Sequence, residues 1–252
     1  HMGDMDEAVT YFRKAANMGA REAAYEIFVL GRQWEKGDGL DKDESKAENC
    51  YKISVDYGIE DAGLALGKLY LRGINGNKPN PRKARRMLEH CSDEGSAEAA
   101  SLLGKIYDEG IMGKVNQDKA FRYYLLAAER GDTGAMLMTG MFYAAGTSTQ
   151  KDLTAAEMWI RKGREEGDPD GDMTLRGFLS VACGEYITGA AGSVDPAKAW
   201  HMAEEAEALG DKEAFLRLGL AFTKSGTKDH AAKAFECYKR AARNRIPAAW
   251  SA

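Results

Sequence analysis

A short motif recurs along the entire chain of 252 residues, and this repeat limits the possible folds more than any other feature of the sequence. Six glycines mark it, each with an alanine eleven positions before it: Gly19, Gly58, Gly95, Gly131, Gly167 and Gly210. Successive marker glycines lie 36 to 43 residues apart, and a seventh alanine, Ala234, continues the series. Self-similarity at this period is typical of solenoids, in which each unit buries its apolar face against its neighbours.

Positions inside each unit follow the spacing of an α-helix. The marker glycine is followed by a small residue four positions on, a glycine nine positions on and an aromatic residue twelve positions on, as in Ala99, Gly104 and Tyr107. Steps of three or four residues keep side chains on one helical face. The sequence therefore predicts two helices per unit, helix A after the marker glycine and helix B before the next one, with left-handed glycine turns between units.

Helix starts and helix lengths can also be predicted. Four residues before the repeat alanine, six of the seven units carry a side chain that can cap the first turn: Asp4, Asp43, Asn80, Asn116, Asp152 and Asp195. Mid-helix glycines such as Gly104 destabilise a helix, so we expect another helix backbone to pass close to them. Insertions of three and seven residues before Gly37 and Gly189 are about one and two helical turns, so we expect two longer A helices.

These elements together predict an all-α solenoid with one leading B helix and six A/B pairs. No linker interrupts the pattern, so we expect one continuous domain over 1–252, with units near 19–57, 58–94, 95–130, 131–166, 167–209 and 210–245. His1-Met2 looks like an expression-vector scar. The sequence starts in a B helix and stops where another A helix would begin. Its ends are therefore natural caps or cuts in a longer array; we favour the cut, in which case the native N-terminus is missing.

The clearest unit reads AASLLGKIYDEG over 99–110 and AFRYYLLAAERG over 120–131. This pattern resembles the Sel-one-like repeat (SLR), a relative of the tetratricopeptide repeat, over essentially the whole chain. The resemblance implies a right-handed superhelix that acts as an adaptor and binds peptides or proteins on its concave face. One secreted bacterial branch of the family carries paired cysteines in each repeat and has been linked to β-lactam binding. This sequence lacks those pairs, so we do not expect that activity.

All but one of the residues that could meet a partner lie at offsets +3, +6, +10 and +13 from the marker glycine, on one face of helix A; Met138 lies next to this stripe. In tetratricopeptide-type stacks the A helices line the concave surface, so the resemblance implies that this face binds the partner. The candidate partner-binding residues are Leu64, Lys68, Glu98, Ser101, Lys105, Asp108, Leu137, Met138 and Met141. Methionine adapts to irregular partners, which suits a peptide groove. Alternatively, Met and Leu at helical spacing fill gaps between units.

The lysines of this stripe suggest a second feature. Lys68 and Lys105 occupy the same offset in consecutive units and would form a two-step basic ladder that could hold a carboxylate. The alternative is that these side chains are merely solvated, because exposed charges on helices contribute little.

Charge and hydropathy argue against two classes of partner. The formal net charge of −4 is unlike that of a nucleic-acid groove, which needs a local excess of Lys and Arg. The mean hydropathy of −0.48, without a long uncharged apolar run, argues against a membrane span. We therefore expect a protein or peptide partner, and self-association remains open.

Motifs for catalysis, cofactors and metals are lacking in the sequence. The histidines are scattered without cysteines at zinc-ligand spacing, and neither a phosphate loop nor a nucleophile elbow occurs. The run from Asp168 to Asp172 resembles the start of a calcium loop, but Met173 and Leu179 stand where the turn glycine and the bidentate Glu are needed. We expect a non-enzymatic scaffold without cofactor. The alternatives are a structural or self-associating module and a hydrolase of cell-wall-type substrates.

The four cysteines are Cys50, Cys91, Cys183 and Cys237. They lie far apart, and three of them take positions of small apolar residues in the repeat, so we expect buried free thiols. Their lack of pairing favours the cytoplasm over an oxidising compartment, and the sequence leaves the localisation otherwise open.

Overall fold

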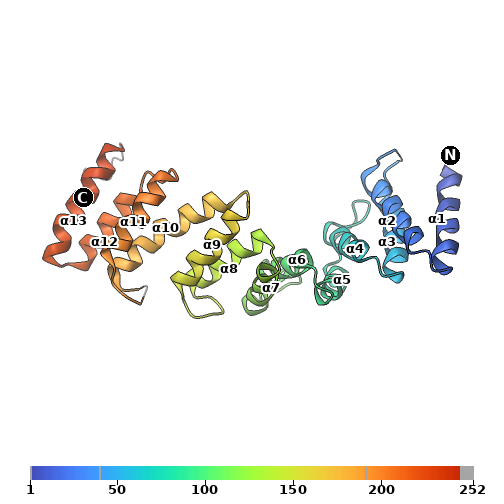
Figure 1. Cartoon of the computed structure of the whole chain (residues 1–252), viewed down its shortest axis with the longest axis horizontal. Coiled ribbons are helices and arrows are strands. Elements are labelled where there is room, and N and C mark those ends of the chain that lie inside the picture. The colour runs from blue at the N-terminus through green and yellow to red at the C-terminus, as the bar shows by residue number, and fades with distance from the viewer. Residues whose placement is uncertain (1, 40, 191, 245–252) are drawn as a thin grey trace. The chain divides into compact units, whose positions relative to one another are not determined.

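The computed structural model describes residues 2–39, 41–190 and 192–244, and every regular element in this part is an α-helix. The helices alternate between the two predicted roles (Figure 1). The B helices are α1 (Met2–Asn17), α3 (Glu44–Asp56), α5 (Pro81–Asp93), α7 (Gln117–Glu129), α9 (Leu153–Glu165), α11 (Pro196–Ala208) and α13 (Lys228–Arg243). The A helices are α2 (Arg21–Lys36), α4 (Glu60–Arg72), α6 (Ala97–Asp108), α8 (Thr133–Ala145), α10 (Gly171–Thr188) and α12 (Ala214–Ser225). The predicted all-α solenoid of helix pairs, with its leading B helix, is confirmed.

Two A helices are longer than the others, as the insertions predicted. The α2 helix has 16 residues and α10 has 18, whereas the other A helices have 12 or 13. Because added helical turns preserve the direction in which each face points, both long helices still pack against the B helix that follows them.

Tight left-handed turns connect each B helix to the next A helix. All six marker glycines have φ between +75° and +108°, a region that favours glycine. At Gly95 the N–H of the next residue, Ser96, donates to the Cys91 carbonyl at 3.0 Å, which is the bond of a Schellman motif. The same bond recurs at Ala20, Ile59, Asp168 and Asp211. The predicted left-handed glycine turns are therefore present between each B helix and the next A helix.

The predicted N-caps hold in five of six cases. The side chains of these five residues accept hydrogen bonds from first-turn N–H groups: Asp43, Asn80, Asn116, Asp152 and Asp195. The prediction for Asp4 is wrong, because α1 already begins at Met2 and Asp4 lies inside the helix. Each of the five confirmed caps therefore fixes the first turn of a B helix at the predicted place.

A backbone hydrogen bond closes the loop between the two helices of a hairpin. The N–H of Asn116, the cap of α7, donates to the carbonyl of Tyr107 in α6 at 2.8 Å. Equivalent bonds of 2.8–3.0 Å run from Asp43 to Trp34, from Asn80 to Tyr70, from Asp152 to Tyr143 and from Asp195 to Tyr186. The aromatic position of the repeat is thus also the point at which each of these loops closes.

Large side chains of the B helix cover the mid-helix glycines. A Cβ placed on Gly104 would lie 2.6 Å from a ring carbon of Tyr124 in α7. Similar conflicts of 2.6–2.8 Å would arise at four more glycines, Gly31 with Tyr51, Gly67 with Leu88, Gly140 with Ile160 and Gly219 with Tyr238. The sequence predicted that a helix backbone passes close to these glycines. Among the five, this holds only for Gly140, where a Cβ would lie 2.9 Å from the carbonyl oxygen of Ala156.

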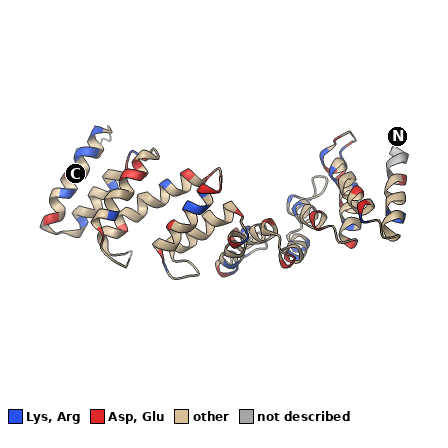
Figure 2. Ribbon diagram, viewed as in Figure 1, with Lys and Arg blue, Asp and Glu red and all other residues tan. Residues whose placement is uncertain are grey.

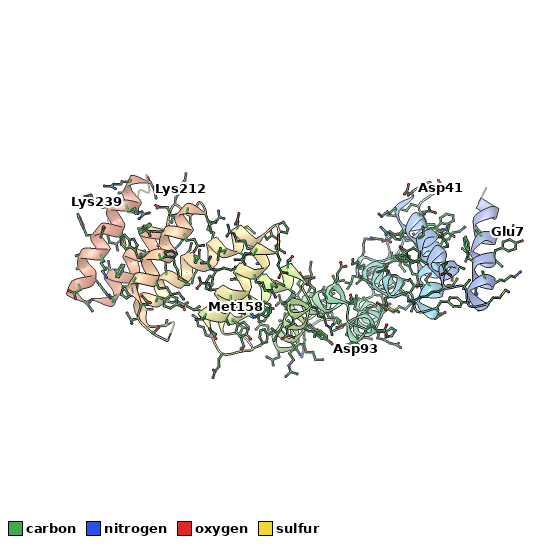
Figure 3. All side chains as sticks on the ribbon, viewed as in Figure 1. Glu7, Asp41, Asp93, Met158, Lys212 and Lys239 are labelled. Atoms are coloured by element: carbon green, nitrogen blue, oxygen red, sulfur yellow. The ribbon has the colours of Figure 1, made fainter. Side chains whose placement is uncertain are left out.

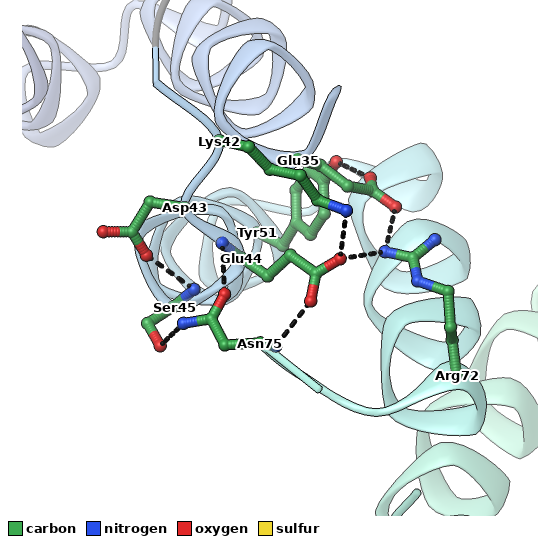
Figure 4. Close-up of polar contacts among 8 residues, drawn as sticks. All are labelled: Glu35, Lys42, Asp43, Glu44, Ser45, Tyr51, Arg72 and Asn75. Carbon is green, nitrogen blue, oxygen red and sulfur yellow. Dashed lines mark hydrogen bonds and ion pairs between the residues drawn. The ribbon is translucent and has the colours of Figure 1, made fainter. Parts of the chain in front are cut away.

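A buried carboxylate connects the loop before α3 to the loop after α4 (Figure 4). Glu44, at the start of α3, is only 4% exposed. Its carboxylate accepts a hydrogen bond from the Asn75 N–H at 2.5 Å and pairs with Arg72 at 3.0 Å and Lys42 at 3.1 Å. Burial alone would raise the pKa of Glu44, but these three donors outweigh it and hold the pKa below its ordinary value.

The same cluster reaches α2 through Arg72. Its guanidinium also donates to Glu35 at 3.0 Å, and Glu35 accepts a further hydrogen bond from the Tyr51 hydroxyl at 2.5 Å. Asn75 returns a bond by accepting the Glu44 N–H at 3.0 Å. Helices α2, α3 and α4 are therefore joined by one polar network in addition to their apolar packing.

Two compact units make up the chain, and each is described by itself. Residues 1–130, with α1 to α7, form unit 1, and residues 131–252, with α8 to α13, form unit 2. Each unit has its own apolar core. The four cysteines lie in these cores as free thiols, as predicted, and burial raises the pKa of Cys183 to about 11. No helix in the described part combines the length and the apolar character needed to cross a bilayer.

Candidate functional site on the A helices

The candidate partner-binding residues all lie on A helices, as their offsets implied. Leu64 and Lys68 are on α4, and four others are on α6, namely Glu98, Ser101, Lys105 and Asp108; all six belong to unit 1. Leu137, Met138 and Met141 are on α8 and belong to unit 2. All charged candidates therefore lie in unit 1, whereas both methionines lie in unit 2.

The charged candidates of unit 1 are engaged with one another or with near neighbours. Lys68 on α4 forms an ion pair of 2.5 Å with Glu98 on α6, and Lys105 lies 3.7 Å from Glu109 one turn further along α6. All four side chains are about half exposed. A partner carboxylate at the proposed basic ladder would compete with these internal carboxylates.

The other candidates in unit 1 are half-buried. Leu64 packs on the cluster of Leu88, Leu103 and their neighbours, so it contributes to the core between repeats. Burial, and next the neighbouring Glu109, raise the pKa of Asp108. Ser101 already has an interaction within the protein. Most candidate side chains of unit 1 therefore already make contacts within that unit.

The candidates of unit 2 differ strongly in exposure. Leu137 is only 5% exposed, and a Cβ placed on Gly163 of α9 would lie 2.9 Å from its Cδ2 atom. Leu137 is thus a packing residue of the α8–α9 hairpin and presents almost no surface to a partner. Met138 is half-buried, and Met141 is 44% exposed. Of the three, Met141 offers the largest exposed fraction.

A hollow of about 280 Å³ lies beside Met141, between α8 and α10. Eight of its lining residues come from the two A helices: Met141, Ala144, Ala145, Gly177, Phe178, Val181, Ala182 and Glu185. Its charged lining residues, Lys151 and Glu185, form an ion pair of 2.5 Å with each other. The rest of the lining is apolar, so the hollow can accept an uncharged side chain without stranding a charge.

The hollow belongs to a wider apolar strip across unit 2. Met141 on α8, Val181 on α10 and Leu220 on α12 are 44%, 63% and 52% exposed. These three helices are neighbours, since α10 packs against both α8 and α12. Throughout its 13 residues α8 carries no charged side chain (Figure 2). Exposed apolar side chains that gather on neighbouring helices are typical of interaction surfaces.

The part of this strip on α10 was not predicted from the sequence, because of the insertion in that helix. When the offsets are counted forward from Gly167, they no longer mark the equivalent positions after the added residues. Counted back from Tyr186, they place Gly177 and Gly184 at the +3 and +10 positions of the other units. The signal was therefore present but required the longer helix to be aligned from its C-terminal end.

A second feature that the sequence analysis missed is a lysine placed over the repeat aromatic residue. The lysine directly before the repeat alanine lies 4.4 to 5.9 Å from the ring centre in five hairpins: Lys46 over Trp34, Lys83 over Tyr70, Lys119 over Tyr107, Lys198 over Tyr186 and Lys233 over Phe222. Such pairs contribute about 0.5–1 kcal/mol each at exposed sites. The exception is the α8–α9 hairpin beside the hollow, where Ala155 takes the place of the lysine.

The acidic run at the start of α10 has internal partners. Asp168 accepts hydrogen bonds from the Thr133 hydroxyl and the Asp170 N–H, both at 2.9 Å, and Asp172 pairs with Arg164 at 2.5 Å. Over the ranges that the structure describes, no group of three or more His, Cys, Asp or Glu side chains could hold a metal ion.

Comparison with protein families identifies the repeat. The family model described as Sel1 repeat matches residues 3–19, 22–56, 62–90, 97–132, 133–168, 181–211 and 216–245. The chain belongs to the Sel1 repeat family. Members of this family are commonly protein-interaction modules. The stretch 169–180, which contains Gly177 and Phe178 of the hollow, lies outside the matched residues of this Sel1 repeat protein.

Curated relatives of this Sel1 repeat protein include DAP3-binding cell death enhancer 1 of Rattus norvegicus, 28% identical over 71% of this chain and 34% of the relative. Chitin synthase regulatory factor 1 of Schizosaccharomyces pombe is 26% identical over 66% of this chain and 28% of the relative. The chain thus spans about a third of the length of these relatives. A protective antigen present in uropathogenic Escherichia coli strains, which displays an SLR fold, is similar in structure. Its TM-score is 0.62, with 23% identity over 93% of this chain and 48% of that one, and this likeness shows the fold alone.

Proposed function

We propose that this Sel1 repeat protein is a non-enzymatic adaptor that holds a peptide or protein segment on the A-helix face of unit 2. The observation that carries the proposal is the apolar hollow between α8 and α10 within the strip of Met141, Val181 and Leu220. Covering these side chains removes apolar surface from water, which favours binding by about 25 cal/mol per Å² before the costs of association.

The chemistry of the strip supports a peptide as the ligand. Methionine fills irregular gaps and accommodates partners of different shape, and the absence of charge on α8 avoids a desolvation penalty on binding. The names of the two curated relatives, one a DAP3-binding protein and the other a regulatory factor, fit an adaptor role. In unit 1 the corresponding stripe carries charges that are paired internally, so it offers less apolar surface.

A peptide selection tests this proposal. A random peptide library displayed on phage is panned against the wild-type protein, and the selected peptides are measured against Val181→Glu. The matched control is Met158→Glu on the B helix α9, because Met158 is 53% exposed and does not line the hollow (Figure 3). We expect Val181→Glu to weaken binding about tenfold or more, which corresponds to 1.4 kcal/mol, and Met158→Glu to leave it unchanged.

The opposite results would contradict the proposal. Selected peptides that bind Val181→Glu as well as the wild type would show that the A-helix face of unit 2 is not the binding surface. Sedimentation velocity on the same proteins tests the alternative of a self-associating module. A wild-type dimer that Val181→Glu dissociates would favour that alternative.

A further inference from the structure

Gly177 differs from most other glycines inside the helices, because nothing in the protein requires it. A Cβ placed on it would meet no atom within 4 Å. The mid-helix glycines that face a neighbouring helix would instead bring a Cβ within 2.6–2.9 Å of another residue: Gly31, Gly63, Gly67, Gly104, Gly140, Gly163 and Gly219. Their lack of a side chain is explained by packing, and that of Gly177 is not.

The position of Gly177 beside the hollow offers another explanation for its lack of a side chain. Glycine is less favourable than alanine in a helix interior, so internal stability alone favours a larger residue here. Gly177 lines the hollow together with Met141, Phe178 and Val181. Any larger side chain at 177 would project into free space at this place and reduce the hollow.

We propose that Gly177 forms the seat for one bulky apolar side chain of a partner peptide, which inserts between Met141 and Val181. This inference rests on the proposed function and adds the chemistry of the anchoring residue. Close approach of a ligand is one of the reasons for a glycine in a regular element. The anchoring side chain gains contact with apolar groups of two neighbouring helices, α8 and α10.

The hollow lies just below the size range of typical small-molecule pockets. Pockets for drug-sized ligands typically have about 300–1,000 Å³, and this hollow has about 280 Å³. Helix-in-groove and peptide-in-groove complexes use individual apolar anchors that fill sites of this kind. The occupant is thus one anchor of a longer segment that continues over the exposed strip.

The charge of the hollow selects an uncharged anchor. Lys151 and Glu185 neutralise each other across 2.5 Å, and the remaining lining has no charged group. A lysine or glutamate inserted between Met141 and Val181 would lose its hydration and could gain a partner only by breaking the Lys151–Glu185 pair, which is unfavourable. Leucine, methionine and phenylalanine meet the requirement, whereas alanine is too small to fill the space.

The experiment uses defined peptides and two substitutions at Gly177. The probe is a fluorescein-labelled 15-residue amphipathic peptide with three leucines on one helical face. In further versions the central leucine is replaced by Phe, Ala, Lys or Glu. We expect the Leu and Phe peptides to bind the wild-type protein, and the Ala, Lys and Glu peptides to bind at least tenfold more weakly in fluorescence anisotropy.

Substitution of Gly177 separates binding from folding. Gly177→Leu should weaken the Leu peptide at least tenfold, and Gly177→Ala severalfold, because both fill the seat. A Cβ at position 177 meets no atom within 4 Å, and the rest of a leucine side chain can extend into the hollow. Both variants should therefore keep the circular dichroism of the wild type, and Gly177→Ala should melt at a higher temperature. A gain in stability with a loss of binding is a combination that a purely structural role cannot produce.

The outcomes distinguish this inference from the proposed function. If Val181→Glu abolishes binding but Gly177→Leu does not, the adaptor surface stands and the seat at Gly177 is refuted. If neither substitution weakens the peptides, or none of the peptides binds, the seat is refuted, and the phage selection then decides on the proposed function. A wild-type dimer that Gly177→Leu dissociates would assign the seat to a second copy and overturn the peptide as its occupant.

Discussion

At the scale of single residues, the hairpins depend on pairs of very different size. A glycine of helix A faces a large side chain of helix B, as with Gly104 and Tyr124. In α10 the corresponding position holds Cys183, and α11 carries the small Ala203 where the other five A/B hairpins have Tyr, Leu or Ile. Both residues are fully buried in the core of unit 2. The larger side chain on helix A, Cys183, is thus matched by a smaller one on helix B, Ala203.

Replacement of Gly104 by alanine tests this size matching. Helix propensity alone would favour the change by about 1 kcal/mol. The new Cβ, however, would lie 2.6 Å from the Tyr124 ring, and overpacking of this kind typically costs about 1–3 kcal/mol. We expect Gly104→Ala to lower the free energy of unfolding, measured by urea denaturation followed by circular dichroism. The matched control, Gly177→Ala, should raise it by about 1 kcal/mol, and a more stable Gly104→Ala would contradict the explanation.

At the scale of elements, loops are fastened by polar groups as well as by caps. The cluster around Glu44 connects the loop that follows α4 to the start of α3 and, through Arg72, to the end of α2. Asn75, which bonds Glu44 twice, has φ +49°, a left-handed conformation that costs energy in a residue with a side chain. Hydrogen bonds with the main-chain N–H and the carboxylate of Glu44, and with the Ser45 hydroxyl, offset this cost. The carboxylate of Glu44 is the part of this network that a substitution can remove.

Glu44→Gln should therefore destabilise the protein in a pH-dependent way. Loss of the charged acceptor weakens bonds to Asn75, Arg72 and Lys42, and we expect about 1–3 kcal/mol in urea denaturation at neutral pH. The folded-state pKa of Glu44 is depressed, so its contribution is present above the ordinary value of 4.5 and is lost as the pH falls through the folded pKa. The difference between variant and wild type should shrink in acid.

An exposed glutamate provides the comparison. Glu98 pairs with Lys68, and its side chain is 53% exposed. Surface ion pairs contribute about 0–1 kcal/mol, so Glu98→Gln should change the unfolding free energy far less than Glu44→Gln. Equal effects of the two substitutions would mean that burial of Glu44 does not determine its contribution.

At the scale of the whole molecule, the expectation of one continuous domain over 1–252 stays a prediction. Units 1 and 2 each have a core of their own. In repeat proteins, stability is approximately a sum of repeat and nearest-neighbour terms, so a perturbation in one unit reaches the next only through their interface. Whether the array is continuous can therefore be tested by asking whether units 1 and 2 unfold together.

Hydrogen exchange in increasing urea measures this coupling. In a continuous array both units should lose protection at the same urea concentration, and Gly104→Ala in unit 1 should shift both transitions together. Amides of α6 in unit 1 and of α12 in unit 2 would report on the two halves. A shift confined to residues 1–130 would establish two independent domains instead.

Sequence reasoning succeeded where structure depends on neighbours along the chain. The caps at Asn116 and Asp152 and the turn at Gly95 are set by a few adjacent residues, so spacing alone predicts them. It was less successful on the A-helix face, where Leu137 and Met141 have the same helical pattern but differ in exposure. Burial there depends on packing against α9 and α10, which adjoining residues do not encode. Gly177 was hidden for a related reason, because an insertion displaced it from the repeat register.

The closure bond between each cap and the preceding aromatic residue has a consequence for engineering. Because main-chain atoms alone form it, as from the Asn116 N–H to the Tyr107 carbonyl, it places no demand on the side chains enclosed in the loop. Enclosed residues such as Met112 and Lys114 can be exchanged while both helices stay anchored, provided that Gly110 and Gly113, with φ of +63° and +110°, are kept. The loop around Gly113 is thus a suitable site at which to introduce an epitope or a fluorophore attachment site.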